Sequence, residues 1–494
     1  MTSVRLNTNE AWLYPELCDV IRLFLGDIVI GEEAGDMCFA HAHSVTGDTW
    51  TETVQSGNRR SVRTAIVCSD ALEAKRRIKR AAKNALFELL MDSLGFCPPW
   101  GSLTGIRPTR LIYEALSEGK TPDEAMRRLT DEFYVSEEKV SLLGEIVQMQ
   151  EGLIYPPENS FDLYIHIPFC VSRCAYCSFA SVEVGKSKLT DAYVQALIQE
   201  LRDGADLMRR LGLTIRSGYV GGGTPTAITT GQLQSVLESA MTLFPGAAEW
   251  TVEAGRPDTI DREKLSMLRQ MQVGRISVNP QSFSDETLRL IGRAHSAEDT
   301  VRAYLLAREM GFHDINMDLI AALPGETADD FRHTLDRTIE LSPESVTVHS
   351  LAIKRSSRLH EQLTVAGGAH NQANAEGADE MIRMARTRLC GAGYRPYYLY
   401  RQKYMAGNLE NVGYALPGYQ CLYNIGNMEE TQRVLAVGAG AITKWIFDRK
   451  RRIERAPNLR NIEEYIARVD ELCQKKRRVI LDEGRALTQN REDT

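Results

Sequence analysis

The chain has 494 residues and a formal net charge of −7, with 43% hydrophobic and 25% charged residues. Its length exceeds a single compact core, so we expect two or three domains, and its composition excludes a disordered or fibrous protein. The negative charge argues against nucleic acid as a partner, because that binding neutralises phosphates with Lys and Arg. Long apolar runs and a secretory signal pattern are absent, which predicts a cytoplasmic protein without a membrane span.

The first part of the chain predicts a small α+β domain, residues 1–155, whose role the sequence does not indicate. The runs "DMCFAHAHSV" and "RRSVRTAIVC" alternate apolar with polar residues around the turn-rich "TGDT" at 46–49, which indicates a hairpin. Residues 71–94 repeat apolar side chains at helical spacing. The proline-bearing stretch "YPPENS" then leaves helical conformation and marks a domain boundary.

Residues 120–150 of the same domain are also expected to be helical. Thr121 is placed to cap the first turn, and Pro122 suits the first helical position, where no backbone N–H is needed.

After residue 160, six short apolar runs alternate with amphipathic segments. The runs are "DLYIHIPF", "SGYVGGG", "EWTVEAG", "RISVNPQ", "DINMDLIAALP" and "SVTVHSLAI". Strands that alternate with helices predict parallel pairing through right-handed crossovers, hence an α/β barrel or an open sheet. Ligands gather at the carboxyl ends of such strands. Unusual residues do lie there, namely a cysteine cluster, "GGGTP", Glu253 and Gln281.

Three cysteines are crowded within "HIPFCVSRCAYCSFAS", residues 166–181: Cys170, Cys174 and Cys177. A cytoplasmic setting keeps thiols reduced, which argues against a disulfide framework. A structural zinc site takes four ligands, and the sequence has no second Cys-x-x-Cys knuckle. A C-x3-C-x2-C loop without a fourth thiolate suits a [4Fe–4S] cluster that leaves one iron open to a non-protein ligand.

The remaining cysteines and two basic runs receive simpler interpretations. We expect each scattered cysteine to be a small buried hydrophobe: Cys18, Cys38, Cys68, Cys97, Cys390, Cys421 and Cys473. The basic runs at 449–452 and 475–478 are expected to be solvated helix faces or ends.

The cysteine spacing, with Tyr176 before the last cysteine and "GGGTP" further on, resembles the radical SAM superfamily. That resemblance implies that S-adenosylmethionine binds the open iron and is cleaved by the reduced cluster to methionine and a 5′-deoxyadenosyl radical. Over residues 160–445 the chain also resembles the oxygen-independent coproporphyrinogen III oxidase family, HemN-like in the broad sense. The strings that carry this likeness are "LYIHIPFCVSRCAYCSF", "GGGTPT", "VEAGRPD", "VNPQSF", "IGRAH", "NMDLIAALPGET" and "SLAI".

An N-terminal extension with "LTGIRPTRL" and a C-terminal "YNIGNMEE" followed by "VGAGA" look most like the HemZ subgroup, the coproporphyrinogen dehydrogenase type. The resemblance implies a partial (β/α)6 barrel of the radical SAM kind at 160–355. A HemN-like α/β domain at 356–494 would follow it, and the α+β domain at 1–155 would precede it.

The resemblance also implies the site. Cys170, Cys174 and Cys177 would bind the cluster, and His166 of "HIPFC" is either a catalytic residue or a hydrogen-bonded core histidine. Glycines at a strand end allow close backbone approach, and Arg293 can meet a carboxylate bidentately. The residues implied around S-adenosylmethionine are Tyr164, Tyr176, Gly222, Gly223, Thr224, Glu253, Gln281, Arg293, Asp318 and Ala352.

The implied activity is oxidative decarboxylation in haem biosynthesis. The radical abstracts a β hydrogen from a propionate of coproporphyrinogen III, and loss of carbon dioxide and one electron leaves a vinyl group. Two such events give protoporphyrinogen IX. The implied partners are this tetrapyrrole and a reductant such as flavodoxin or ferredoxin. Basic residues near the site are placed to meet acidic side chains of the substrate, or are solvated charges: Arg173, Lys354, Arg355 and Arg358.

Two departures from the family pattern point in opposite directions. The oxidase branch carries a fourth cysteine where this chain has Phe179, an aromatic that is typical of the haem chaperone branch. The chaperone branch has a His-Asn pair where this chain has Tyr423 and Asn424, and that tyrosine could instead pack under the barrel. Three hypotheses therefore stand: a porphyrinogen oxidative decarboxylase, a haem-binding delivery protein, and another radical SAM enzyme, a methyltransferase or ring-opening enzyme, acting on a tetrapyrrole.

Overall fold

The computed structural model describes residues 3–481 except 27, 34, 106, 179–180, 187, 353–356, 358, 360, 362–372, 402–408 and 448–451. Phe179, Lys354, Arg355 and Arg358 therefore lie outside the described residues. The chain divides into two compact units, one formed mainly by the residues up to Glu145 and the other mainly by those from Ile146 onward. The three predicted domains, 1–155, 160–355 and 356–494, remain a prediction.

The first unit contains a sheet that, among its described residues, has the strand order β2-β1-β3-β4-β5. These strands are β1 (Ser3–Thr8), β2 (Val29–Gly31), β3 (Met37–Thr46), β4 (Thr49–Ser56) and β5 (Arg59–Ile66). The expected turn at 46–49 joins β3 to β4, but the sequence did not predict β4 itself. The inward positions of β4 include Glu52, fully buried beside Trp50 and Val54, so its apolar alternation is broken.

Helices α1 (Tyr14–Leu25) and α2 (Ala71–Leu94) pack with the sheet into one apolar core. The predicted helix at 71–94 is confirmed. Three further helices follow: α3 (Thr109–Ser117), α4 (Pro122–Phe133) and α5 (Glu137–Met149). The predicted cap is also confirmed, because Thr121 Oγ1 accepts from Glu124 N at 3.3 Å and Glu124 Oε2 accepts from Thr121 N at 2.8 Å.

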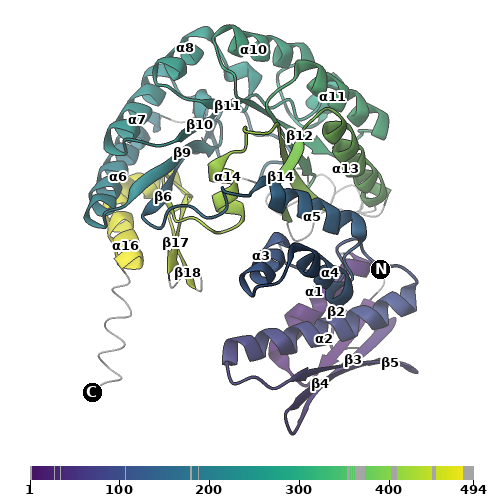
Figure 1. Cartoon of the computed structure of the whole chain (residues 1–494). Helices are drawn as coiled ribbons and strands as arrows, with labels where there is room; N and C mark the ends of the chain where they lie inside the picture. Colours follow the sequence, from purple (N-terminus) through teal and green to yellow (C-terminus); the bar gives the residue numbers. More distant parts are fainter. Residues whose placement is uncertain are drawn as a thin grey trace, which may run out of the picture. The chain divides into compact units, whose positions relative to one another are not determined.

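In the second unit, eleven of the described strands form one open sheet in the order β14-β15-β13-β12-β11-β10-β9-β6-β16-β17-β18. Six parallel strands form the middle of this sheet, and they lie side by side in the order in which they occur in the chain. These strands confirm the six predicted runs. They are β6 (Ser160–Ile167), β9 (Thr214–Gly222), β10 (Glu249–Glu253), β11 (Arg275–Ser277), β12 (Ile315–Ala321) and β13 (Ser345–Ser350). The sheet curves as a partial barrel (Figure 1).

Helices connect these strands and line the outer side of the curved sheet (Figure 1). They are α6 (Thr190–Arg210), α7 (Thr230–Leu243), α8 (Arg262–Gln270), α10 (Ala297–Glu309) and α11 (Ala328–Leu341). The short helix α9 (Asp285–Leu290) lies between β11 and α10 in the chain. Leu197 and Leu201 of α6 and Leu233 and Leu237 of α7 are buried in a core shared with the strands. Capping boxes at Thr229, Ser296 and Thr327 begin α7, α10 and α11.

The C-terminal part of the chain supplies both edges of this sheet. On one side β15 (Glu410–Ala415) pairs antiparallel with β13, and β14 (Arg395–Arg401) lies beside it. On the other side β16 (Val434–Val437) pairs in parallel with β6. β17 (Ile442–Phe447) and β18 (Arg452–Pro457) continue the sheet from there. The C-terminal helices are α13 (Ala373–Gly391), α14 (Leu422–Met428), α15 (Ile462–Ala467) and α16 (Val469–Leu481).

Two expectations about single residues were wrong. Cys38 and Cys97 are exposed and not buried, because they lie on an outward strand position and in a loop. In the second basic run, Lys476 is only 3% exposed, because its ammonium group donates to Glu200 Oε1 at 2.6 Å inside the unit.

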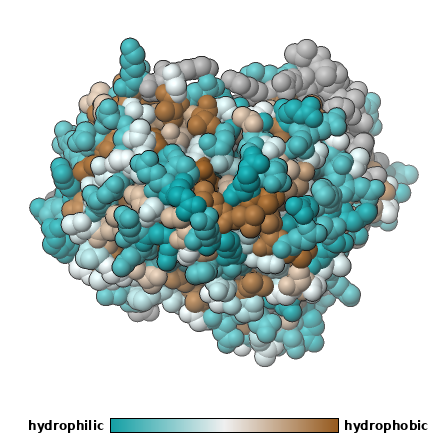
Figure 2. Space-filling model, turned by 90° about the horizontal axis from the view of Figure 1, so that it is seen from above, coloured by the Kyte–Doolittle hydropathy of each residue, from teal (hydrophilic) through white to brown (hydrophobic). Residues whose placement is uncertain are grey.

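No helix within the described parts of the chain is long and apolar enough to cross a membrane. On the face shown in Figure 2, hydrophilic side chains cover most of the surface and apolar side chains gather near its middle.

Candidate cofactor site

The three clustered cysteines lie on a loop that follows β6. Cys170 is on the short strand β7 (Phe169–Cys170), which pairs with β8 (Val182–Glu183). Backbone hydrogen bonds hold the loop: Cys177 N donates to Cys174 O at 3.2 Å, and Ala175 N donates to Ile291 O at 2.9 Å. Cys170 and Cys174 are each 8% exposed, whereas Cys177 is half-buried. The loop thus presents three thiols from a fixed backbone.

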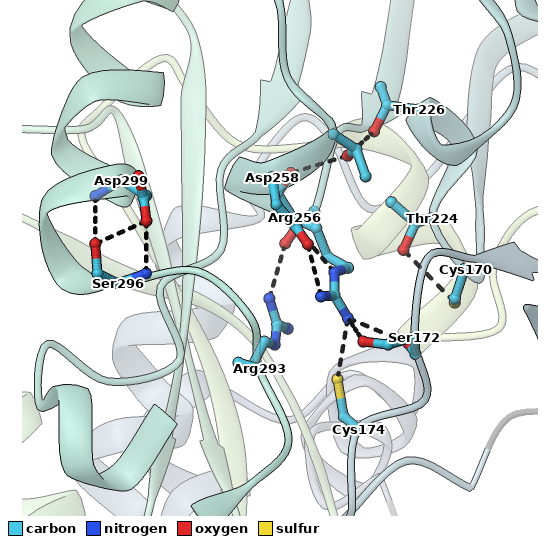
Figure 3. A network of polar contacts seen from close by, with 12 residues as sticks. Cys170, Ser172, Cys174, Thr224, Thr226, Arg256, Asp258, Arg293, Ser296 and Asp299 are labelled. Carbon is cyan, nitrogen blue, oxygen red and sulfur yellow. Dashed lines mark hydrogen bonds and ion pairs between the residues drawn. The ribbon is translucent and has the colours of Figure 1, made fainter. Parts of the chain in front are cut away.

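Hydrogen-bond donors point at two of the sulfur atoms (Figure 3). Thr224 Oγ1 donates to Cys170 Sγ at 3.6 Å, and Arg256 Nη1 donates to Cys174 Sγ at 3.8 Å. Donors and cations stabilise thiolates, which are the form that binds metal. Among the described residues, no three His, Cys, Asp or Glu side chains close around a single metal ion. Three thiols on one short loop are the ligand type of iron–sulfur clusters.

Glycines let the end of β9 pass against this loop. Gly222 has φ +114°, and a Cβ there would lie 2.0 Å from His166 Cδ2. A Cβ on Gly223 would lie 2.6 Å from Phe169 O. Only glycine fits either position, so the end of β9 packs directly against His166 and the Phe169 backbone.

His166 is held in one orientation. Its Nδ1 donates to Ala439 O, and Tyr193 Oη donates to the His166 carbonyl oxygen at 2.6 Å. Burial lowers the pKa of His166, which keeps the ring neutral near pH 7. The structure shows the hydrogen-bonded core histidine, and a direct chemical role remains a prediction.

Glu253 ends β10 beside the glycines. Tyr219 Oη donates to Oε1 at 2.8 Å, and Gly222 N donates to Oε2 at 3.2 Å. Burial raises the pKa of Glu253 to about 7, with a further contribution from Asp318 that the two hydrogen bonds do not offset. The carboxyl group is therefore poised between its two protonation states at neutral pH.

Asp318 on β12 is fixed by two amides, because Asn279 Nδ2 and Asn316 Nδ2 each donate to its carboxylate at 2.7 Å. Gln281 lies next to it, with its backbone N donating to Asp318 O at 3.0 Å. Gln281 has φ +66° and is 5% exposed, and its Oε1 has no hydrogen-bond partner. An orphaned buried amide oxygen in a strained backbone position fits a ligand that supplies the missing donor.

Arg293 connects this edge of the barrel to the cysteine loop. Its Nη2 donates to Tyr176 Oη at 3.1 Å, and its Nη1 donates to Gly255 O and Asn279 O at 3.3 Å each. Its Nε is buried without a partner. Within the protein this guanidinium therefore meets a phenol and carbonyl groups, and the carboxylate contact expected from the resemblance remains a prediction.

Tyrosines fill the barrel beside β6. Tyr164 stacks on Tyr423 with ring centroids 5.8 Å apart, and Tyr219 stacks on the same ring at 4.5 Å. Tyr423 thus packs inside the barrel, as the packing interpretation predicted. Ala352 lies half-buried just after β13.

The structure joins six of the predicted residues into two chains of contacts. One runs from Tyr176 through Arg293 to Asn279, Asp318 and Gln281, and the other from Gly222 to Glu253. Sequence reasoning missed several polar residues that position these side chains: Tyr219, Arg256, Asp258, Asn279 and Asn316. Those after β10 and β11 could have been found in "GRPD" and "VNPQ", since they lie at the same strand ends as Glu253 and Gln281.

Comparison with known proteins gives the family. The radical SAM superfamily profile matches residues 164–338. The oxygen-independent coproporphyrinogen-III oxidase-like protein HemZ of Bacillus subtilis is 38% identical over 448 residues, covering 88% of this chain and 89% of its own. The chain belongs to the HemZ family of radical SAM proteins.

Other relatives of this HemZ-family protein match over shorter stretches. Heme chaperone HemW of Escherichia coli is 31% identical, covering 58% of this chain and 70% of its own. Oxygen-independent coproporphyrinogen III oxidase of Escherichia coli is 33% identical, covering 42% and 45%. The solved structure of coproporphyrinogen III oxidase (HemN) from Escherichia coli shares the fold, with TM-score 0.52 and 24% identity over 66% of this chain and 72% of that one.

The cofactors of the family are a [4Fe–4S] cluster and S-adenosylmethionine, and the residues present fit both. The loop of Cys170, Cys174 and Cys177 offers thiolates with donors aimed at two of them. The orphaned Oε1 of Gln281 fits a small polar ligand that supplies the missing donor.

Proposed function

We propose that this protein is an oxygen-independent coproporphyrinogen III oxidase of the dehydrogenase type. The observation that carries the proposal is its 38% identity to the coproporphyrinogen-III oxidase-like protein HemZ, over 88% of this chain and 89% of that one. In each conversion a propionate loses one β hydrogen atom and carbon dioxide and passes one electron to an acceptor, which leaves a vinyl group. Two conversions give protoporphyrinogen IX.

The cofactors, when bound, supply the abstraction of the hydrogen atom, and the residues of the chain hold and orient the reactants. Cys170, Cys174 and Cys177 would bind the cluster. Gly222, with Glu253, Gln281 and Asp318, would bind S-adenosylmethionine through the backbone and through carboxylate and amide oxygens.

An anaerobic turnover assay tests the proposal. The full chain is reconstituted with iron and sulfide, and then incubated with dithionite, S-adenosylmethionine and coproporphyrinogen III. We expect 5′-deoxyadenosine together with tetrapyrrole that has lost two carboxyl groups. Formation of 5′-deoxyadenosine without decarboxylation would contradict the oxidase.

A haem-binding delivery protein is the second candidate, because heme chaperone HemW relatives match up to 60% of this chain and an aromatic residue occupies position 179. The same preparation distinguishes the two. Stoichiometric haem binding, seen as a Soret band that survives gel filtration, without decarboxylated product would favour the delivery protein.

A further inference from the structure

Arg256 is a buried arginine that follows β10 and contacts the cysteine loop (Figure 3). It is 3% exposed. Its Nε and Nη2 donate to the two oxygens of Asp258 at 3.0 and 2.8 Å. Its Nη1 donates to Ser172 O at 3.2 Å, to Ser172 Oγ at 2.9 Å and to Cys174 Sγ at 3.8 Å.

The two edges of this guanidinium have separate partners. Asp258 binds one edge bidentately, which fixes the plane of the group and leaves Nη1 aimed at the cysteine loop. Because the N–H groups of Nη1 serve three acceptors, the loop is both anchored and placed next to a permanent positive charge. At Cys170 the corresponding donor is the neutral hydroxyl of Thr224, at 3.6 Å.

We propose that Arg256 raises the reduction potential of the cluster held by Cys170, Cys174 and Cys177, and that Asp258 is the positioning residue for its guanidinium. The inference rests on the cysteine assignment made under the proposed function. One-electron reduction by a low-potential donor adds one negative charge to the cluster. A cation that donates a hydrogen bond to a ligand sulfur stabilises that more negative state.

The test is a redox titration of the reconstituted full-length protein, followed by electron paramagnetic resonance of the reduced cluster. At the potential where half of the wild-type cluster is reduced, we expect Arg256→Gln to lower the ratio of reduced to oxidised cluster about tenfold. For a one-electron couple this corresponds to a shift of about 59 mV.

Arg262→Gln is the matched control. Arg262 lies at the start of α8 in the same unit and pairs with Glu309, with both side chains 60% exposed. Its substitution removes the same charge without removing the contact that Arg256 makes with the cysteine loop. The cluster of the Arg262→Gln protein should therefore have the midpoint potential of the wild type. The signal reports only on cluster that is present, so incomplete loading does not alter the midpoint.

Arg256→Lys keeps the charge but not the planar fork, and a smaller shift in the same direction is expected. Midpoint potentials equal to that of the wild type in both Arg256 variants would overturn the proposal. Loss of the cluster from both variants would also overturn it, because Arg256 would then be a structural anchor of the loop. A wild-type protein that shows no reducible [4Fe–4S] signal would instead refute the cysteine assignment, and with it the proposed function.

Discussion

Gly222 at the end of β9 packs against His166 and donates its backbone N–H to Glu253. Its φ of +114° and the 2.0 Å separation between a built Cβ and His166 Cδ2 mean that any side chain must displace the imidazole. We expect Gly222→Ala to lower the free energy of unfolding by about 2 to 4 kcal/mol, from backbone strain and overpacking together. Hydrogen exchange of β6 and β9 peptides in increasing urea measures the loss.

Gly231→Ala is the control for that substitution, because it lies in the first turn of α7 and a Cβ there meets no atom within 4 Å. Its stability should equal or slightly exceed that of the wild type. Equal stability of Gly222→Ala and Gly231→Ala would contradict the proposed contact with His166.

Glu253 makes the stability of the barrel depend on pH. Burial raises its pKa to about 7 in the folded protein, above the value of about 4.3 in an unfolded chain. Between these values the folded state binds more protons, so stability falls as pH rises and levels off above pH 7. Over the full range this contribution is about 4 kcal/mol, of which about 3 kcal/mol is lost between pH 5 and pH 8.

Glu253→Gln removes this titrating group. The free energy of unfolding of the variant, minus that of the wild type, should therefore rise by about 3 kcal/mol from pH 5 to pH 8. Urea unfolding at several pH values, followed by hydrogen exchange of β10 peptides, gives the measurement. A difference that is constant across this range would mean that Glu253 titrates normally.

The crowding of three cysteines on one loop could be predicted because they lie within eight positions of one another. The contact between Arg256 and Ser172 could not, since 84 residues separate them and the contact depends on the path of the loop after β7. Local spacing thus predicts which thiols are neighbours, while their surroundings need the folded chain.

At the scale of elements, helix α16 docks on α6 through a buried ion pair. Lys476 Nζ donates to Glu200 Oε1 at 2.6 Å, with side chains 4% and 1% exposed. Glu200 also accepts from Gly438 N, Asn458 Nδ2 and Tyr465 Oη. One carboxylate therefore binds groups from α16, α15 and the loop after β16.

We expect Lys476→Met to lower the free energy of unfolding by about 3 kcal/mol, because it leaves Glu200 buried without its counterion. Thermal unfolding of Lys476→Met against Lys475→Met tests this, since Lys475 is exposed one position earlier and its variant should be unaffected. Adding Glu200→Gln to Lys476→Met should recover part of the loss. A neutral Lys476→Met would show that the pair does not support the docking.

The strands of the barrel were predictable because each is a short buried run between amphipathic helices, a pattern that buried parallel strands share. The strands that flank them, β15 and β16, were not, since β15 pairs antiparallel with β13 and β16 has only four residues. The burial of Lys476 in α16 was also not predictable. A run of basic residues looks the same in the sequence whether its lysines are all exposed or one of them pairs with a buried carboxylate.

At the scale of the whole molecule, the two compact units have separate apolar cores. Leu86 is fully buried in the core of the first unit. We expect Leu86→Ala to destabilise that unit by about 2 to 5 kcal/mol through the cavity that it creates. The visible absorbance of the reconstituted cluster, which belongs to the second unit, should be lost at the same temperature as in the wild type.

Calorimetry together with that absorbance tests the independence of the two units. Leu237→Ala, in the core of the second unit, serves as the reciprocal variant and should lower the temperature at which the cluster is lost. If Leu86→Ala lowered that temperature as much as Leu237→Ala, the units would unfold as one.

The pairing of β16 with β6 can form only late in the synthesis of the chain. His166 and the carbonyl of Ala439 that holds its ring are 273 residues apart, which the ribosome covers in roughly 15 to 55 seconds. For that interval the nascent barrel has an unpaired strand edge, open to association with other chains. Iron that reached the cysteine loop during this interval would meet a neighbouring histidine that is not yet held, so the surroundings of the loop are completed by a segment that is made 273 residues later.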